Sequence, residues 1–147
     1  MDKPQWNPKD KAGSLQEWIG ALNNEARRQF LLAGTHIELF FMFGDDGLQE
    51  VVPVVAMEKA EVIAAFKKLL AGRNGYAYIH IAEATVRRVD SGAESDSLLL
   101  IAESRDGLSE AWISTVVRRN EEKLLLDAVR ISGSRLQGRF MGIFEEL

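Results

Sequence analysis

The feature that most constrains the fold is a series of strand-like segments in the second half of the chain. These segments are largely apolar, and they cover residues 76–89, 97–104, 110–118 and 123–131. Short breaks that contain Gly, Asn, Asp or Ser separate them, and these residues are typical of turns. Because consecutive strands with short connections pair antiparallel, the sequence predicts an antiparallel sheet.

Three further strands are predicted outside this series. Two of them, over residues 35–43 and 48–56, are joined by the turn sequence Gly44-Asp45-Asp46-Gly47. Pro53 cannot donate a backbone hydrogen bond, which predicts that its strand is an edge strand or contains a bulge. A last short strand is expected over residues 139–144.

Apolar residues at helical spacing predict two helices, over residues 15–32 and 58–71. The first follows the capping-box sequence Ser14-Leu15-Gln16-Glu17, and Gly34 is placed to end it. The expected order is therefore α-β-β-α-β-β-β-β, with room for a final β. This order is typical of an α+β fold, with a mainly antiparallel sheet of about five to seven strands and two helices.

The length of 147 residues fits a single domain. Residues 1–13 contain two prolines and show no periodicity, so we expect a flexible N-terminal tail before one α+β domain over residues 14–147. Within this tail, Trp6 is expected to pack onto the domain. The chain has no cysteine, which excludes disulfides, thiolate catalysis and cysteine-based zinc sites.

The formal net charge is −4, so the chain lacks the overall basic charge of many phosphate-binding proteins. No apolar run approaches the roughly 18 residues of a membrane span. The polar N-terminal residues do not resemble a secretory signal. We therefore expect a cytoplasmic protein that does not contact a membrane.

Register arithmetic brings three glutamates of the predicted sheet into one row. A two-residue turn at Asp106-Gly107 would place Glu103 opposite Glu110. A loop folded symmetrically about Ala93 would place Glu83 opposite Glu103. Like charges that face each other destabilise a sheet, so such a row calls for a compensating group.

The negative charge of Glu83, Glu103 and Glu110 could be compensated in three ways. These are a bound cation, a proton shared between carboxyl groups, and the positive charges of the neighbouring Arg105 and Arg87. The functional interpretation is a hard-metal or acid/base site. The structural interpretation, which we favour, is a solvated rim at the strand ends. A slip of one residue in either hairpin would move residues to the opposite face and destroy the row.

The other chemical signals are weak. His36 and Glu38 share a strand face, but two residues do not make a metal site, and His80 is expected to be packed or hydrogen-bonded. No glycine-rich nucleotide motif or nucleophile elbow is present, so no pattern identifies a cofactor. Basic residues could gather for nucleic-acid binding together with Phe140 and Phe144, although acidic neighbours favour ordinary surface charge. These basic residues are Arg27-Arg28, Lys67-Lys68, Arg87-Arg88, Arg118-Arg119, Arg130, Arg135 and Arg139.

Several predicted strands are apolar on both faces, whereas a sheet with one solvated face should alternate. If both helices cover one face, the other needs a partner. Our register places Leu99, Ile101 and Trp112 on one face, as a candidate interface. It places Leu98, Leu100 and Ile113 on the other.

A homodimer is the commonest way to bury such a surface. The leading hypothesis is therefore a small binding or interaction module that self-associates and that could also bind a protein partner. The alternatives are an enzyme or metal-binding protein that uses the carboxylate row, and a nucleic-acid-associated protein.

Overall fold

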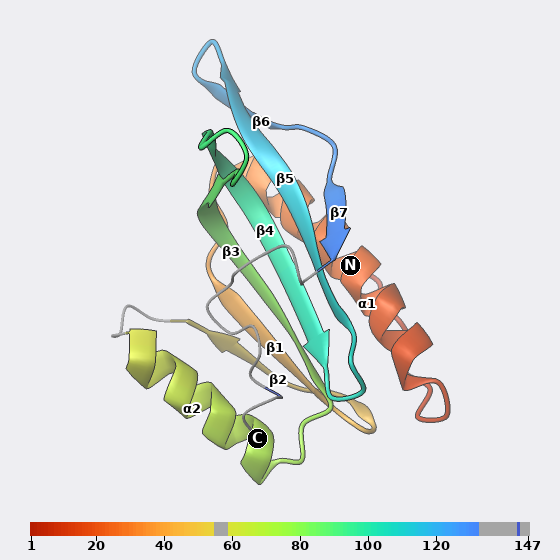
Figure 1. Cartoon of the computed structure of the whole chain (residues 1–147). Coiled ribbons are helices and arrows are strands. Elements are labelled where there is room, and N and C mark those ends of the chain that lie inside the picture. Colours follow the sequence, from red (N-terminus) through yellow and green to blue (C-terminus); the bar gives the residue numbers. More distant parts are fainter. Residues whose placement is uncertain (55–58, 133–143, 145–147) are drawn as a thin grey trace.

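The computed structural model describes residues 1–54, 59–132 and 144, and it shows a twisted antiparallel sheet with one helix on each face (Figure 1). The elements within these residues are α1 (Lys11–Ala33), β1 (Leu39–Gly44), β2 (Gly47–Pro53), α2 (Lys59–Gly72), β3 (Ala77–Arg87), β4 (Glu94–Ser104), β5 (Ser109–Arg119), β6 (Glu122–Leu125) and β7 (Val129–Ser132). This order confirms the predicted α+β fold. Apart from Phe144, the strand predicted over residues 139–144 lies outside the described residues, as do residues 55–56 of the strand predicted over 48–56.

Helix α1 begins four residues before its predicted start, so the prediction of Ser14 as its cap was wrong. Asp10 is the N-cap, and its side chain accepts a hydrogen bond from the Gly13 backbone N–H at 3.1 Å. The Ser14 hydroxyl instead accepts a hydrogen bond from the Asn7 backbone N–H at 2.8 Å. Gly34 ends the helix as predicted, with a left-handed φ of 75°.

Trp6 packs onto the domain, as expected for this residue of the N-terminal segment. Its ring stacks on Phe43 with a centroid distance of 5.5 Å and meets Tyr76 edge-on at 6.0 Å. Its indole N–H donates to the Asp45 carbonyl at 2.8 Å. The segment before α1 therefore covers one end of the core.

The strands are ordered β2-β1-β3-β4-β5-β6, and β7 also pairs with β5. Pro53 lies in β2, an edge strand, as predicted. The Val54 N–H donates to the Glu38 carbonyl at 3.0 Å, so the next pair, Leu39 with Pro53, is a non-hydrogen-bonded pair. The backbone nitrogen of Pro53 is therefore directed away from β1, where its missing N–H leaves no gap in the ladder.

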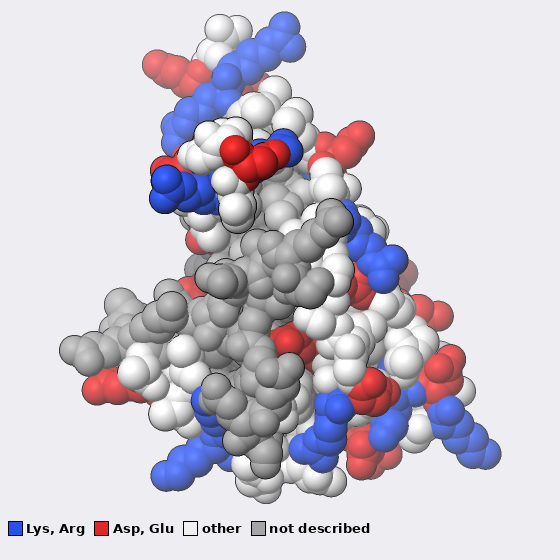
Figure 2. Space-filling model, viewed as in Figure 1, with Lys and Arg blue, Asp and Glu red and all other residues white. Residues whose placement is uncertain are grey.

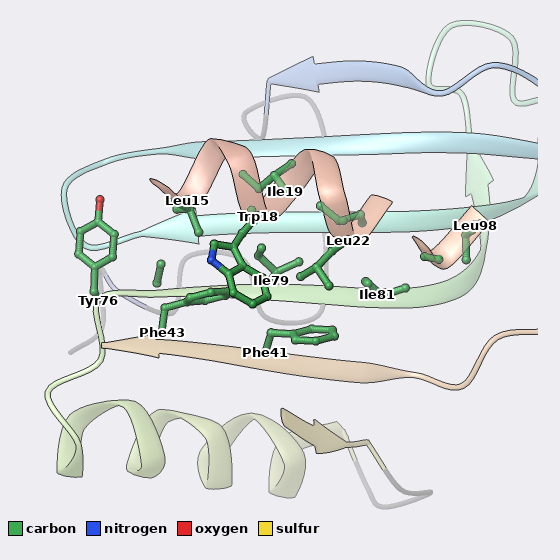
Figure 3. Packing of buried hydrophobic residues seen from close by; sticks show 14 of the residues in the cluster. Leu15, Trp18, Ile19, Leu22, Phe41, Phe43, Tyr76, Ile79, Ile81 and Leu98 are labelled. Carbon is green, nitrogen blue, oxygen red and sulfur yellow. The ribbon is translucent and has the colours of Figure 1, made fainter. Parts of the chain in front are cut away.

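The two helices cover opposite faces of the sheet, so the condition under which one face would need a partner, that both helices lie on the other face, is not met. On the α1 face, Trp18 and Leu22 lie against Phe41 and Ile79 (Figure 3). The α2 face has its own core. This second core contains Phe40, Met42, Tyr78, Leu99, Ile101 and Ala111 with Val62, Phe66 and Leu70 of α2.

The strand predicted over residues 123–131 is divided into β6 and β7, which pair with different halves of β5. The predicted turn before it is present. Arg119 pairs with Glu122, and the two residues between them, Asn120 and Glu121, have φ values of 51° and 72°. Two positive φ values in a two-residue hairpin loop are typical of a type I′ turn.

We predict that Glu121→Gly stabilises the protein by about 0.5–1 kcal/mol, because a glycine adopts positive φ without the steric cost that a residue with a Cβ incurs. Urea denaturation measures the change. Glu122→Gly is the matched control, since glycine in the adjacent strand should be destabilising. If Glu121→Gly left the protein no more stable than the wild type, the assigned turn would be wrong.

Candidate functional site

The predicted row of three glutamates does not form, because both hairpins have a different register. Tyr78 pairs with Glu103 in the β3–β4 ladder, and Glu83 pairs with Leu98. Five residues of β4 therefore separate Glu103 from the level of Glu83, or about 16 Å along the strand. In the β4–β5 ladder, Glu110 pairs with Ala102, which places it on the α1 face, whereas Glu103 lies on the α2 face.

Turn geometry explains both differences. The β4–β5 turn has three residues, Arg105 to Gly107, because the Ser104 N–H donates to the Leu108 carbonyl at 2.9 Å and Gly107 adopts a φ of 103°. The β3–β4 loop is shorter than expected, since the Arg88 N–H donates to the Ala93 carbonyl at 2.9 Å. One extra turn residue moves every later side chain to the other face.

Each glutamate instead has its own hydrogen-bond partners. Glu83 accepts from the Thr35 hydroxyl at 2.7 Å and from the His36 N–H at 3.2 Å. Glu103 accepts from the Tyr78 hydroxyl at 2.5 Å. The buried Glu110 accepts from the Gln16 amide at 2.6 Å and from Arg130. Arg105 donates to Asn74 at 2.8 Å. Among the described residues, no group of three or more His, Asp or Glu side chains could hold a metal ion.

The two histidines also make structural contacts. His80 is buried, as expected, and its Nε2 lies 2.8 Å from a carboxylate oxygen of Glu38. His36 does not pair with Glu38, and its Nδ1 lies 2.6 Å from the Ile37 carbonyl oxygen.

Two buried tyrosines donate hydrogen bonds to the β4–β5 hairpin, Tyr76 on the α1 face and Tyr78 on the α2 face of the sheet. Burial, together with the charge of Glu103 and the hydrogen bond to it, raises the pKa of Tyr78. Burial and a 2.7 Å hydrogen bond to Asp106 raise the pKa of Tyr76 to about 12. Both hydroxyls therefore remain protonated and donate to carboxylates at neutral pH. Burial opposes ionisation of Asp106, but hydrogen bonds from Ser104 and Tyr76 outweigh it and lower the pKa of that carboxyl.

The most distinctive feature lies at the opposite end of the sheet, where the two C-terminal hairpins separate. The β4–β5 ladder ends at the pair Ser97 and Thr115, although β4 starts at Glu94 and β5 continues to Arg119. Beyond that pair, β4 pairs only with β3, and β5 only with β6. Figure 1 shows the two hairpin tips as separate projections.

A groove of about 360 Å³ lies between the separated hairpins, and we call it the hairpin groove. Acidic side chains come from the β3–β4 hairpin and basic ones from the β5–β6 hairpin, while α1 contributes an aromatic ring. The lining residues are Phe30, Glu83, Ala84, Thr85, Asp96, Ser97, Val116, Arg118 and Lys123.

The C-terminal end of α1 ties both walls of this groove together. Glu83 binds Thr35 and His36, directly after the helix. From the other wall, the Lys123 ammonium donates to the Gly34 carbonyl at 2.8 Å and lies 5.7 Å from the centre of the Phe30 ring. A cation is favourable at a helix C-terminus. The separation of the hairpins is thus held by specific contacts.

Two groove side chains retain hydrogen-bonding capacity. Arg118 is exposed and makes no hydrogen bond or ion pair within the described part of the chain. Within the same residues, the Asp96 side chain accepts only a 3.3 Å hydrogen bond from Thr85.

Sequence reasoning missed this site because no motif marks the point where a ladder ends. The only local signal was the charged residues near the hairpin tips.

The predicted interface residues are not on a free surface. Leu99 and Ile101 are buried in the α2-face core, so they are unsuited to an interface in this fold. Trp112 pairs with Leu100 and packs on the α1 face, while Ile113 pairs with Leu99, so both were assigned to the wrong face.

Exposed apolar side chains instead occur on the outer strands. Leu124, Leu126 and Val129 form what we call the outer apolar surface, with exposures of 36%, 52% and 58%.

Comparisons of the chain with protein-family models, curated proteins and solved structures found no match. Of the helices in the described ranges, none has the length and apolar character required to cross a membrane.

We predict that Asp106→Asn lowers stability at neutral pH by under about 1 kcal/mol, since this exposed carboxylate is screened. A carboxyl whose pKa is lowered by folding stabilises the protein above its unfolded pKa of about 3.9, and the effect is lost as pH falls through its folded pKa. The difference between wild type and variant should therefore shrink below about pH 4. Urea denaturation at several pH values measures it, with Asp46→Asn as control. A difference independent of pH would contradict the role of the ionised Asp106.

Proposed function

We propose that this protein is a binding module whose ligand occupies the hairpin groove. The observation that carries the proposal is that β4 and β5 continue beyond the end of their ladder, with a groove between them. Ligand sites are typically concave, with a few polar groups placed around an apolar lining. Phe30 and Val116 supply apolar surface here, and charged side chains lie around them.

The charges indicate which ligands would fit. Glu83 and Asp96 give one wall negative charge, and Arg118 and Lys123 give the other wall positive charge. A ligand that carries both a cationic and an anionic group would satisfy both walls. Arg118 suits a carboxylate because its guanidinium can form two parallel hydrogen bonds with one.

The metal or acid/base alternative has lost its geometric support, because Glu83, Glu103 and Glu110 have separate partners. The nucleic-acid alternative is also weakened. Arg87 lies opposite Glu94 in the β3–β4 ladder, and Arg88 forms an ion pair with Asp90 at 3.3 Å. Figure 2 shows basic and acidic side chains interspersed among the described residues of the face in view.

We predict that ε-aminocaproate, which carries one ammonium and one carboxylate, binds the groove weakly, with a dissociation constant of about 1 mM. In NMR titrations, the backbone amide signals of Thr85, Asp96 and Val116 should shift and saturate. Arg118→Gln should weaken binding about tenfold, because it removes a charge-assisted hydrogen bond.

Caproate and hexylamine, which each lack one of the two charged groups, should bind more weakly than ε-aminocaproate. Arg119→Gln is the matched protein control, since Arg119 does not line the groove. If ε-aminocaproate caused no saturable shift, or bound no better than caproate, the proposed site would be wrong.

Self-association remains a second candidate function, now assigned to the outer apolar surface. Leu124 pairs with Val117, and Val129 pairs with Ile113, so these side chains share the α2 face at the outer end of the sheet. Contact between two copies across this surface would shield the exposed apolar side chains from water.

We predict a sedimentation mass near twice the 16.4 kDa chain mass at micromolar concentration. Leu126→Asp should give the single-chain mass, because it places a charge in the proposed interface. Leu32→Asp is the control, since Leu32 is 75% exposed near the end of α1 and outside this surface. A single-chain mass for the wild type would refute self-association.

A further inference from the structure

We infer that two copies of this chain pair edge to edge through β6, as antiparallel strands related by a two-fold axis at Leu125. The inference rests on the proposed self-association and adds the contact that joins the two copies. Two observations carry it, the direction of the β6 backbone groups and the order of side chains along the strand.

The outer edge of β6 carries backbone groups that point away from the sheet. β6 is the last strand in the order β2-β1-β3-β4-β5-β6. The Leu126 N–H donates to the Thr115 carbonyl at 2.9 Å, so these two residues occupy a hydrogen-bonded position of the β5–β6 register. Such positions alternate along an antiparallel ladder, so the N–H and C=O groups of Lys123 and Leu125 are directed away from β5. No residue in the described ranges bonds to these outward groups.

The opposite end of the sheet is protected against strand addition. Pro53 of β2 has no N–H, and its backbone nitrogen lies on the outer side of that edge strand. A proline of this kind blocks pairing with another strand. β6 contains no proline, so of these two ends it is the one suited to receive a strand.

The side chains from β6 onward form a self-complementary series, Lys123-Leu124-Leu125-Leu126-Asp127. A two-fold axis at Leu125 places Leu124 opposite Leu126 of the second copy. The same axis places Lys123 opposite Asp127 of the second copy. Apolar pairs and opposite charges that face each other across two strands are stabilising. A second copy of the chain therefore matches this edge in both apolar surface and charge.

The neighbouring register is less favourable. An axis at Leu124 would place Glu122 opposite Leu126, and Glu121 opposite Asp127. The first pair sets a carboxylate against an apolar side chain, and the second sets two like charges against each other. The side chains therefore favour the axis at Leu125.

The side chains of the proposed contact are accessible in the single chain. Leu124 and Leu126 are 36% and 52% exposed. Asp127 is exposed and makes no hydrogen bond or ion pair with any described residue. The Lys123 ammonium has three N–H donors, and its hydrogen bond to the Gly34 carbonyl uses one of them. Pairing would thus bury the leucines and satisfy the two charges.

A cysteine introduced into the strand tests the contact, because the chain has no other thiol. In the proposed pair, the two copies of residue 125 face each other with Cα atoms about 5.5 Å apart, which a disulfide can span. Leu125→Cys should therefore form a linked dimer in a glutathione redox buffer. Leu124→Cys is the matched control, since its two copies would lie diagonally, about 7–8 Å apart, and too far to be bridged.

Hydrogen exchange and a charge reversal test the wild-type contact. The amides of Lys123 and Leu125 should exchange more slowly as the protein concentration is raised. Asp127→Lys replaces both Lys–Asp pairs by Lys–Lys pairs and should weaken the dimer about tenfold in sedimentation. Asp46→Lys is the control, because it makes the same charge change in the β1–β2 turn.

The outcomes separate the contact from self-association itself. If the wild type is a dimer but Leu125→Cys is not linked and neither amide becomes protected, edge pairing is refuted while self-association stands. A disulfide in Leu124→Cys and not in Leu125→Cys would overturn the register. Equal weakening by Asp127→Lys and Asp46→Lys would refute the Lys–Asp pair. A single-chain mass for the wild type would refute both proposals.

Discussion

The constraint on which the rest of the structure depends is that β1, β3 and β4 are apolar on both faces. In β1, Phe41 and Phe43 belong to the core under α1, while Phe40 and Met42 belong to the core under α2. A sheet of this kind has no face that can be left to water, so each helix has to cover a different one. This arrangement places Leu99 and Ile101 in the interior, and it accounts without a partner for much of the apolar surface that had suggested a dimer.

Local signals predicted the elements well but not the register. Most strands and turns can be recognised from a few neighbouring residues. The positive φ values at Gly34 and Gly107, for example, occur at glycines that were expected to end a helix and to form a turn. The face on which Trp112 lies, however, depends on whether the preceding turn contains two or three residues. The sequence around Asp106 is compatible with a two-residue turn and with a three-residue turn. The free-energy difference between these two turns includes the packing of the whole hairpin. The carboxylate row failed for the same reason.

The hairpin groove could not be predicted from the sequence because it lies where the pairing between β4 and β5 stops. The sequences of β4 and β5 favour strand up to the hairpin tips, and nothing within them marks the end of their mutual pairing at Ser97 and Thr115. The separation depends on contacts with a helix that lies far away in sequence. Glu83 and Lys123 both bind the segment that follows Phe30, one from each hairpin. Such contacts require the tertiary structure before they can be recognised.

These contacts also explain why the two hairpins do not simply close the gap. Opposite charges on Asp96 and Arg118 should draw the walls together, and the exposed strand backbones would gain hydrogen bonds by pairing. The end of α1 opposes both effects, because Glu83 of one hairpin binds Thr35 and His36, and Lys123 of the other hairpin binds Gly34. The gap is thus held by contacts with the end of α1, while Arg118 on one wall keeps its hydrogen-bonding groups unused within the described part of the chain.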